Sequence, residues 1–209
     1  MAAALTTFAR YVRPDVLGCP EIVILDAILR AGIEFCKRTK VSKENIAITT
    51  IINTAAYPLV TASPTNTIVD EVLNVNRDLY STLRPSSVFE IEAMRYDIQT
   101  GLSYYYYLDN NNQLVLGLVP NGIETLTAVV KTIPTDNATT LPDVLARRYK
   151  LEIAAGAKAM LMLDAGKQWS NPKYAAVHQG IFNAGIDLAN VREARGNSMK
   201  PLRTRTYQF

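Results

Sequence analysis

The stretch that decides the fold is KLEIAAGAKAMLMLDAGKQWSNPKYAAVHQGIFNAGI, residues 150–186. Apolar and small side chains recur at helical spacing on both sides of a short polar segment that contains Gly166 and an Asn-Pro pair. Glycine favours the end of one helix, and asparagine followed by proline favours the start of the next. The sequence therefore predicts two helices, over about 143–165 and 172–195, that form an antiparallel hairpin.

Small side chains indicate where this hairpin packs closely. A glycine inside a helix costs about 1 kcal/mol relative to alanine, so Gly156 suggests the close approach of another backbone. Phe182 and Gly185 lie on the apolar face of the second helix. These three residues are predicted to serve helix packing or subunit packing. His178 lies on the same face and is interpreted as a packed or interface histidine rather than a catalyst.

An amphipathic helix is also predicted over about 20–39, PEIVILDAILRAGIEFCKRT, because apolar residues recur close to i, i+3, i+4 and i+7. Pro20 suits the first helical position, and the basic residues Lys37 and Arg38 lie in the last turn, where cations are favoured. We expect this helix to join the hairpin in a three-helix bundle.

The segment 45–135 differs in composition and pattern. It contains many β-branched residues, turn signals and short alternations of apolar and polar residues. An Asp-Asn-Asn-Asn turn at 109–112 and a Pro-Asn-Gly turn at 120–122 separate candidate strands. A short helix is expected over 85–92. We expect a small antiparallel meander. The candidate strands are Ala47–Ile52, Val69–Val75, Ser103–Leu108, Gln113–Leu118 and Glu124–Lys131.

The predicted fold class is α+β: a helical bundle with a long C-terminal helical hairpin, a small antiparallel β insert and an extended C-terminal arm. Residues 1–195 are expected to form a single domain that contains the β insert, and residues 196–209 are expected to form the arm.

Charge is distributed unevenly along the 209 residues, whose net charge is +3. From Arg192 to the end, five basic residues stand against one acidic residue, so the rest of the chain is nearly neutral. No apolar run approaches the roughly 18 residues of a membrane span, and the first residues lack the apolar core of a signal peptide. A soluble intracellular product with two reduced cysteines, Cys19 and Cys36, is expected.

The common motifs of catalysis and nucleotide binding are missing from the sequence, which has no GxSxG, phosphate-binding loop, GxGxxG or HExxH. His178 is the single histidine, which excludes most metal sites and catalytic triads. No catalytic residue, cofactor or metal site is predicted, and the protein is not expected to be an enzyme.

Four consecutive tyrosines, residues 104–107, stand out in the β-rich segment. In a strand their side chains alternate between the two faces. We interpret one pair as core and the other as part of a protein interface, in preference to a platform for nucleobases.

Several short motifs, in this order, resemble a known family. The first predicted helix ends in IEFCKRT (33–39), the β-rich segment contains GLSYY (101–105) and LGLVP (116–120), and GKQWSNP (166–172) joins the two hairpin helices. Over about 20–195 the chain resembles the head-to-tail adaptor (connector) proteins of tailed bacteriophages, and it is similar in plan to the tail tubular proteins of short-tailed phages.

This resemblance implies a structural virion protein. Such adaptors form a ring, twelve copies under the portal, which seals the filled head and presents a platform for the tail. The implied partners are the portal protein, tail or nozzle proteins and other copies of the chain, with non-specific contact to DNA in the lumen and no membrane. The implied location is the head–tail junction of the virion, after assembly in the host cytoplasm.

Residues 196–209 are predicted to form an arm that docks on the portal or on a neighbouring subunit. Extended, they reach roughly 45–50 Å, which is enough to leave their own subunit. The alternation from Arg203 to Tyr207 is compatible with a strand added to a partner's sheet. A disordered solvated end and a DNA-facing arm are the alternatives. The residues assigned to partner binding are Lys200, Pro201, Leu202, Arg203, Arg205, Tyr207 and Phe209.

Two other functions compete with the adaptor. One is a nucleic-acid-binding module that uses the basic tail and the tyrosine-rich strand, but such a module is expected to carry a basic patch on its folded part. The other is a virion enzyme that acts on the cell wall, against which the missing catalytic constellation counts.

Overall fold

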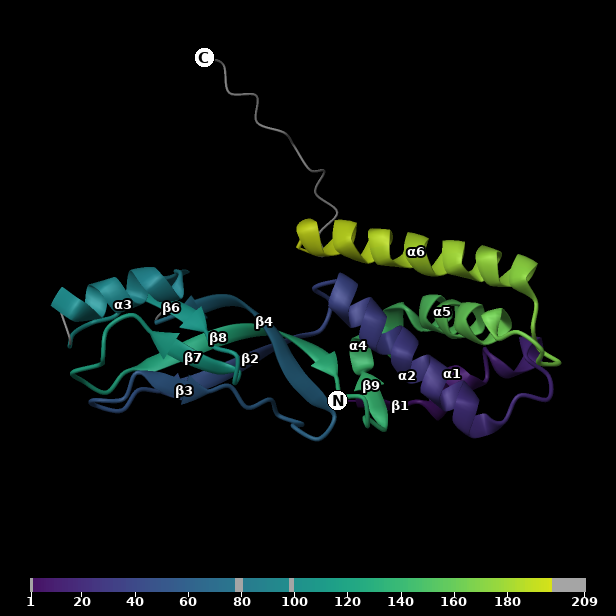
Figure 1. Cartoon of the computed structure of the whole chain (residues 1–209), viewed down its shortest axis with the longest axis horizontal. Coiled ribbons are helices and arrows are strands. Elements are labelled where there is room, and N and C mark those ends of the chain that lie inside the picture. Colours follow the sequence, from purple (N-terminus) through teal and green to yellow (C-terminus); the bar gives the residue numbers. More distant parts are fainter. Residues whose placement is uncertain (1, 78–80, 98–99, 197–209) are drawn as a thin grey trace, which may run out of the picture. The chain divides into compact units, whose positions relative to one another are not determined.

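The computed structural model describes residues 2–77, 81–97 and 100–196, and these form two compact units (Figure 1). The first, here called the helical unit, combines residues up to Ser42 with residues from Asp136 onward. The second, the sheet unit, is Lys43–Thr135. In the described ranges, no helix is both long enough and apolar enough to cross a membrane.

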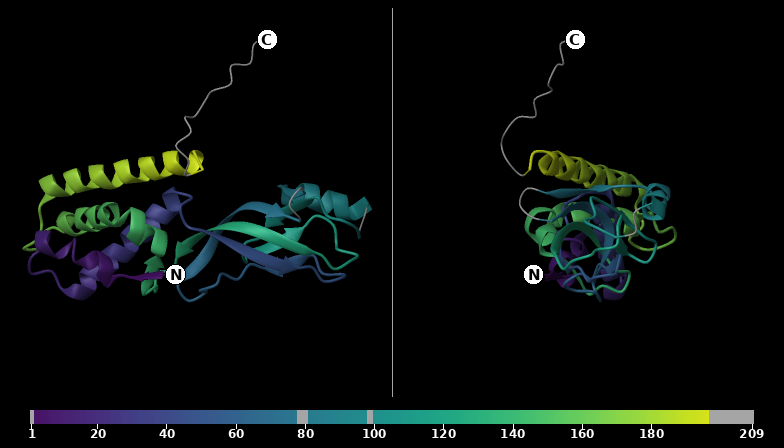
Figure 2. Two further views of the ribbon diagram at one scale, coloured as in Figure 1. Left: turned by 180° about the vertical axis from the view of Figure 1, so that it is seen from behind. Right: turned by 90° about the vertical axis from the view of Figure 1, so that its left-hand side faces the viewer.

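The helical unit is built on three helices that pack together, α2, α5 and α6. Figure 2 shows α6 along the outside of this unit, beside α5. A two-stranded antiparallel sheet of β1 and β9, which the sequence analysis did not predict, joins the start of the chain to the start of the C-terminal helices. The elements are β1 (Ala2–Ala4), α1 (Thr6–Ala9), a 3₁₀ turn (Arg13–Asp15), α2 (Glu21–Arg38), β9 (Thr140–Pro142), α4 (Asp143–Arg148), α5 (Lys150–Leu163) and α6 (Pro172–Ala194).

Local signals explain where α6 begins and where its hairpin turns. The side chain of Asn171 accepts a hydrogen bond from the Tyr174 backbone N–H at 3.3 Å, and Pro172 stands at the first helical position. Gly166, with φ +75°, lies in the turn that follows α5, in a region that favours glycine. These are the residue types from which the hairpin was predicted.

The single helix expected over 143–165 is divided in two. Tyr149 lies between α4 and α5 with φ −132° and ψ 22°, outside the helical region. Its side chain is only 1% exposed, and its ring centroid lies 5.0 Å from that of Phe35 in α2. Phe35 in turn lies 6.0 Å from the ring of Phe182 in α6. This aromatic group forms the centre of the helical unit, and the break between the helices accompanies the burial of the tyrosine.

The sheet unit is a seven-stranded sheet with the strand order β2-β8-β4-β5-β6-β7-β3, curved into a nearly closed, barrel-like form. All neighbouring strands pair antiparallel except β5 and β6, which are parallel and are connected by a crossover that contains α3. The elements are β2 (Lys43–Thr49), β3 (Ala56–Pro58), β4 (Thr67–Asn76), β5 (Thr82–Pro85), α3 (Val88–Asp97), β6 (Tyr105–Leu108), β7 (Gln113–Leu116) and β8 (Thr125–Pro134).

The predicted fold class was therefore wrong. The chain is not a helical bundle with a small antiparallel meander, because the sheet unit is a compact body of its own that spans Lys43–Thr135. Its interior is filled by side chains from nearly every strand, among them the fully buried Val75, Leu114, Leu126 and Val130. The physical reason for the error is pairing between strands distant in sequence. Two such strands, β3 and β5, are only three and four residues long, too short to show a clear alternation.

Candidate interaction surfaces

The predicted site residues fall into two groups. Gly156, Phe182 and Gly185 lie in the hairpin of α5 and α6, where the structure gives their surroundings. The seven residues assigned to partner binding, from Lys200 to Phe209, lie outside the described residues.

The hairpin helices approach closely at two glycines. A Cβ built on Gly156 would lie 2.7 Å from Cδ2 of Phe182, and a Cβ built on Gly185 would lie 2.4 Å from Cγ of Glu152. Real Cβ atoms essentially never come so close to another heavy atom. The ring of Phe182, which is fully buried, therefore occupies the space that a side chain at Gly156 would need.

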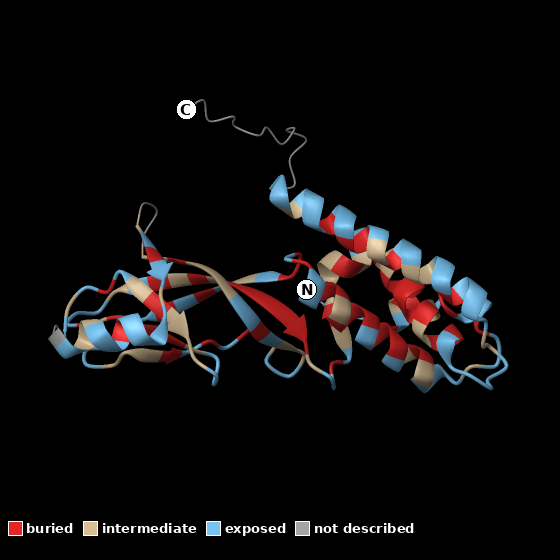
Figure 3. Ribbon diagram, turned by 45° about the horizontal axis from the view of Figure 1, so that its top comes forward, coloured by how far each residue is buried: buried red, intermediate tan, exposed pale blue. Residues whose placement is uncertain are grey.

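A second apolar face of α6 points away from this contact. We call it the outer stripe. Its residues are spaced by three and four positions in alternation, and the five larger ones are 41–61% exposed. Figure 3 shows the exposed residues along this helix beside the buried ones that face α5. The outer stripe consists of Tyr174, Val177, Ile181, Ala184, Leu188 and Val191.

The outer stripe was not predicted from the sequence, because only one apolar face was assigned to the helix over 172–195. Successive helical residues turn by about 100°, so the buried residues, such as Phe182 and Ile186, and the stripe residues occupy separate sectors of the helix. Both sectors are visible in the sequence as alternating spacings of three and four. Exposed apolar side chains gathered on one side of a helix commonly mark a contact surface.

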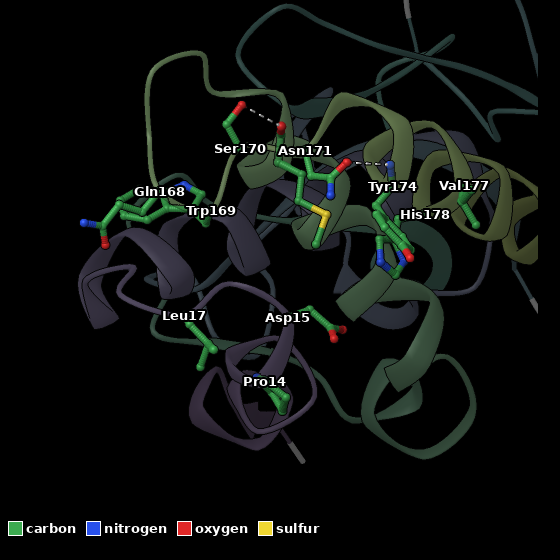
Figure 4. Close-up of a pocket in the computed structure, with 11 residues that line it drawn as sticks. Pro14, Asp15, Leu17, Gln168, Trp169, Ser170, Asn171, Tyr174, Val177 and His178 are labelled. Carbon is green, nitrogen blue, oxygen red and sulfur yellow. Dashed lines mark hydrogen bonds between the residues drawn. The ribbon is translucent and has the colours of Figure 1, made fainter.

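A pocket of about 610 Å³ adjoins the first turns of α6 (Figure 4). Tyr174 and Val177 of the outer stripe line it, together with Leu17, Asp15 and Trp169. The carboxylate of Asp15 pairs with Nζ of Lys158 at 2.5 Å, and the aspartate side chain remains 44% exposed. The pocket thus joins apolar walls to one partly exposed carboxylate at the end of the stripe.

His178 also lines this pocket, and it is half-buried rather than flush with the core. Its Nδ1 atom is buried and has no hydrogen-bond partner among the residues that the structure describes. Burial lowers the pKa of His178 below its usual value, and the positive charge of Lys158 lowers it further, while Asp15 acts in the opposite direction. The imidazole is therefore held toward its neutral form.

The four tyrosines of the sheet unit do not divide into an inner and an outer pair. Tyr106 alone is buried, at 4% exposure, and burial together with the charge of Glu71 raises the pKa of its hydroxyl. Tyr105 and Tyr107 are half-buried, and Tyr104 is 57% exposed beneath the guanidinium group of Arg77, 5.5 Å from the ring centroid.

The sheet unit also exposes aromatic side chains on α3. Phe89 and Tyr96 are 84% and 89% exposed. They are seven residues apart, which places them on the same side of the helix. Large apolar side chains gathered at a surface commonly mark a protein contact.

The described residues include no grouping of histidine, cysteine, aspartate and glutamate that could hold a metal ion. The candidate interaction surfaces are the outer stripe and the pocket in the helical unit, and the exposed Phe89 and Tyr96 in the sheet unit. In the comparisons with known proteins, a family model described as SU10 adaptor protein matches residues 2–205.

The chain belongs to the SU10 adaptor protein family. This supports the resemblance to phage adaptor proteins, whereas the similarity to tail tubular proteins stays a prediction. An SU10 adaptor protein is a structural component of a bacteriophage virion, which is not a class of enzyme, and it associates with other phage head or tail proteins. A search of curated proteins found no match.

Proposed function

We propose that this SU10 adaptor protein forms a ring that joins the portal of the filled phage head to the tail. Twelve copies are expected in the ring, each contacting the portal protein and the tail or nozzle proteins at the head–tail junction. The family match over residues 2–205 carries the proposal.

Exposed apolar side chains in both units support this function. The outer stripe belongs to the helical unit, and Phe89 and Tyr96 belong to the sheet unit. A soluble protein that works alone rarely keeps several such groups in water. A subunit that contacts its own copies and two other proteins has a use for more than one apolar surface.

The C-terminal arm is proposed to anchor the ring. Leu202, Tyr207 and Phe209 would fill apolar sites on the portal or on a neighbouring subunit, and Arg203 and Arg205 would pair with acidic residues there. Deleting residues 200–209 should leave the two units folded, because their cores lie within residues 2–196.

Assembly with purified portal rings tests the proposal. Electron microscopy and mass measurement of the mixture should show a second ring on the portal, with the mass of twelve copies. Replacing Leu202, Tyr207 and Phe209 together by serine should reduce this binding at least about tenfold, since buried apolar anchors dominate interfaces. The control is the double substitution Thr204→Ser and Thr206→Ser, which should bind as the natural protein does.

Two results would count against the proposal. If the protein stayed a free monomer beside the portal at every concentration, the ring would be wrong. If the triple-serine variant bound the portal as tightly as the control, the ring could stand but the anchoring role of the arm would be lost.

A further inference from the structure

We propose that, in the free subunit, the outer stripe of α6 is the docking surface for residues 197–209 of the same chain. The proposal concerns the subunit before assembly and goes beyond the ring function. It starts from a helix with two apolar faces, one of which packs on α5 while the other has no described element over it.

The stripe has the length of a docking groove. From Tyr174 to Val191 it runs about 26 Å along the helix axis. Its larger side chains, Tyr174, Val177, Ile181, Leu188 and Val191, are 41–61% exposed. Such a surface exposed to water favours association with another apolar segment.

The position and length of the C-terminal segment make it the fitting occupant. It follows Gly196, whose φ of +61° ends the helical path one turn beyond the stripe. Thirteen extended residues reach about 43–47 Å, and the helix from Gly196 back to Tyr174 measures about 33 Å. The segment can therefore run back along the whole stripe and enter the pocket.

The chemistry of the segment matches this path. At about 3.3–3.6 Å per extended residue, Leu202 would lie beside Ile181 and Ala184, and Tyr207 would reach the pocket. Asp15, whose carboxylate is 44% exposed in the pocket, can accept a hydrogen bond from Arg205 in addition to the one from Lys158.

Because residues 197–209 are covalently joined to α6, docking on the α6 of the same chain is favoured over docking on that of another copy. A segment joined to its target by a short chain meets it at an effective concentration in the millimolar range. A second copy at micromolar concentration competes poorly with that. Docking in the same chain covers the apolar groups of both the stripe and the arm until a partner takes the arm.

Disulfide trapping in the full-length protein tests the docking, with Cys19 replaced by serine and no portal present. The test pair is Val177→Cys with Thr204→Cys, because residue 204 of the extended segment lies about 26–29 Å from Gly196 and Val177 lies about 28 Å from it along the helix. The control pair is Ala176→Cys with Thr204→Cys. Both positions on α6 are exposed and neighbours in sequence, but only Val177 belongs to the stripe. Both lie within reach of residue 204.

The test pair should form an intramolecular disulfide at least about tenfold faster than the control pair, at a rate independent of protein concentration. Adding Ile181→Asp to the test pair should bring its rate down to that of the control, whereas Ala194→Asp, a matched charge off the stripe, should not. Equal rates for the two pairs, a product that is mainly a disulfide-linked dimer, or a test-pair rate unaffected by Ile181→Asp would each overturn the proposal. None of these measurements depends on whether a ring forms.

Discussion

The helical unit and the sheet unit hold their cores together in different ways. In the helical unit, the rings of Phe35, Tyr149 and Phe182 pack at the centre, and two glycines allow α5 and α6 to approach closely. Most ion pairs among its described residues are well exposed, with the exception of the pair between Lys158 and Asp15. Arg13 and Glu21, for example, keep side-chain exposures of 54% and 44%. In the sheet unit the core is mainly aliphatic, and the ion pairs are more buried.

The pair between Arg77 and Glu124 shows the contrast. Nε of Arg77 lies 2.5 Å from Oε2 of Glu124, the two side chains are only 12% and 21% exposed, and the guanidinium group also donates to the Ser103 carbonyl oxygen. Close packing is therefore expected to contribute most to the stability of the helical unit, and the pairing of buried charges is expected to contribute more in the sheet unit.

The largest effect is expected from Phe182→Ala, because this fully buried ring fills the space above Gly156. The substitution should lower the free energy of unfolding by about 3–5 kcal/mol. Ile181→Ala, one residue away on the outer stripe, should cost about 1 kcal/mol or less. Urea denaturation measures both. Equal losses would mean that the two faces of α6 have been assigned wrongly.

The sheet unit should respond most to the loss of a charge partner. Arg77→Met leaves the carboxylate of Glu124 largely buried and unpaired, and should cost about 2–4 kcal/mol. Arg13→Met, the matched change in the exposed pair of the helical unit, should alter the unfolding midpoint little. Adding Glu124→Gln to Arg77→Met should restore part of the loss. No recovery in this double variant would show that the charge is not the cause.

The sequence predicted those parts of the structure whose signals lie close together along the chain, and it failed where distant segments pair. The hairpin could be predicted because its signals are local, such as the cap formed by Asn171 and the glycine turn at Gly166. The parallel pairing of β5 with β6, where Arg84 faces Tyr105, depends on the crossover through α3. Nothing in either short strand indicates its neighbour, so the sheet order could not be predicted.

The candidate surfaces follow the same rule. Gly156 and Phe182 lie on the facing sides of two helices that a short turn connects. Helical spacing and the turn signals were therefore enough to predict that both residues serve packing. The pocket joins Asp15 to residues at the start of α6 that are distant in sequence. Only the folded chain shows that the outer stripe ends at this pocket.

Replacing a helical glycine by alanine sharpens the comparison within the helical unit, because two sites should respond with opposite signs. At Gly156 the new Cβ would lie 2.7 Å from the Phe182 ring, and overpacking should cost about 1–3 kcal/mol. At Gly180, which lies in α6, a new Cβ meets nothing within 4 Å, so the gain in helix propensity should stabilise by about 0.5–1 kcal/mol. Thermal or urea unfolding of the two variants measures both changes in stability. If the two changes had the same sign, the packing described here would be contradicted.

The smallest effect is expected from His178, the chain's one histidine, which lies in the helical unit. Because burial and Lys158 hold its pKa below the usual value near 6.5, the unfolded chain binds a proton there more readily than the folded one. Stability is therefore lost as the pH falls below about 6.5. From pH 7 to pH 5, the melting temperature of the natural protein should fall by more than that of His178→Gln. The sheet unit has no histidine to contribute. Equal falls in melting temperature would show that His178 is as easily protonated in the folded chain as in the unfolded one.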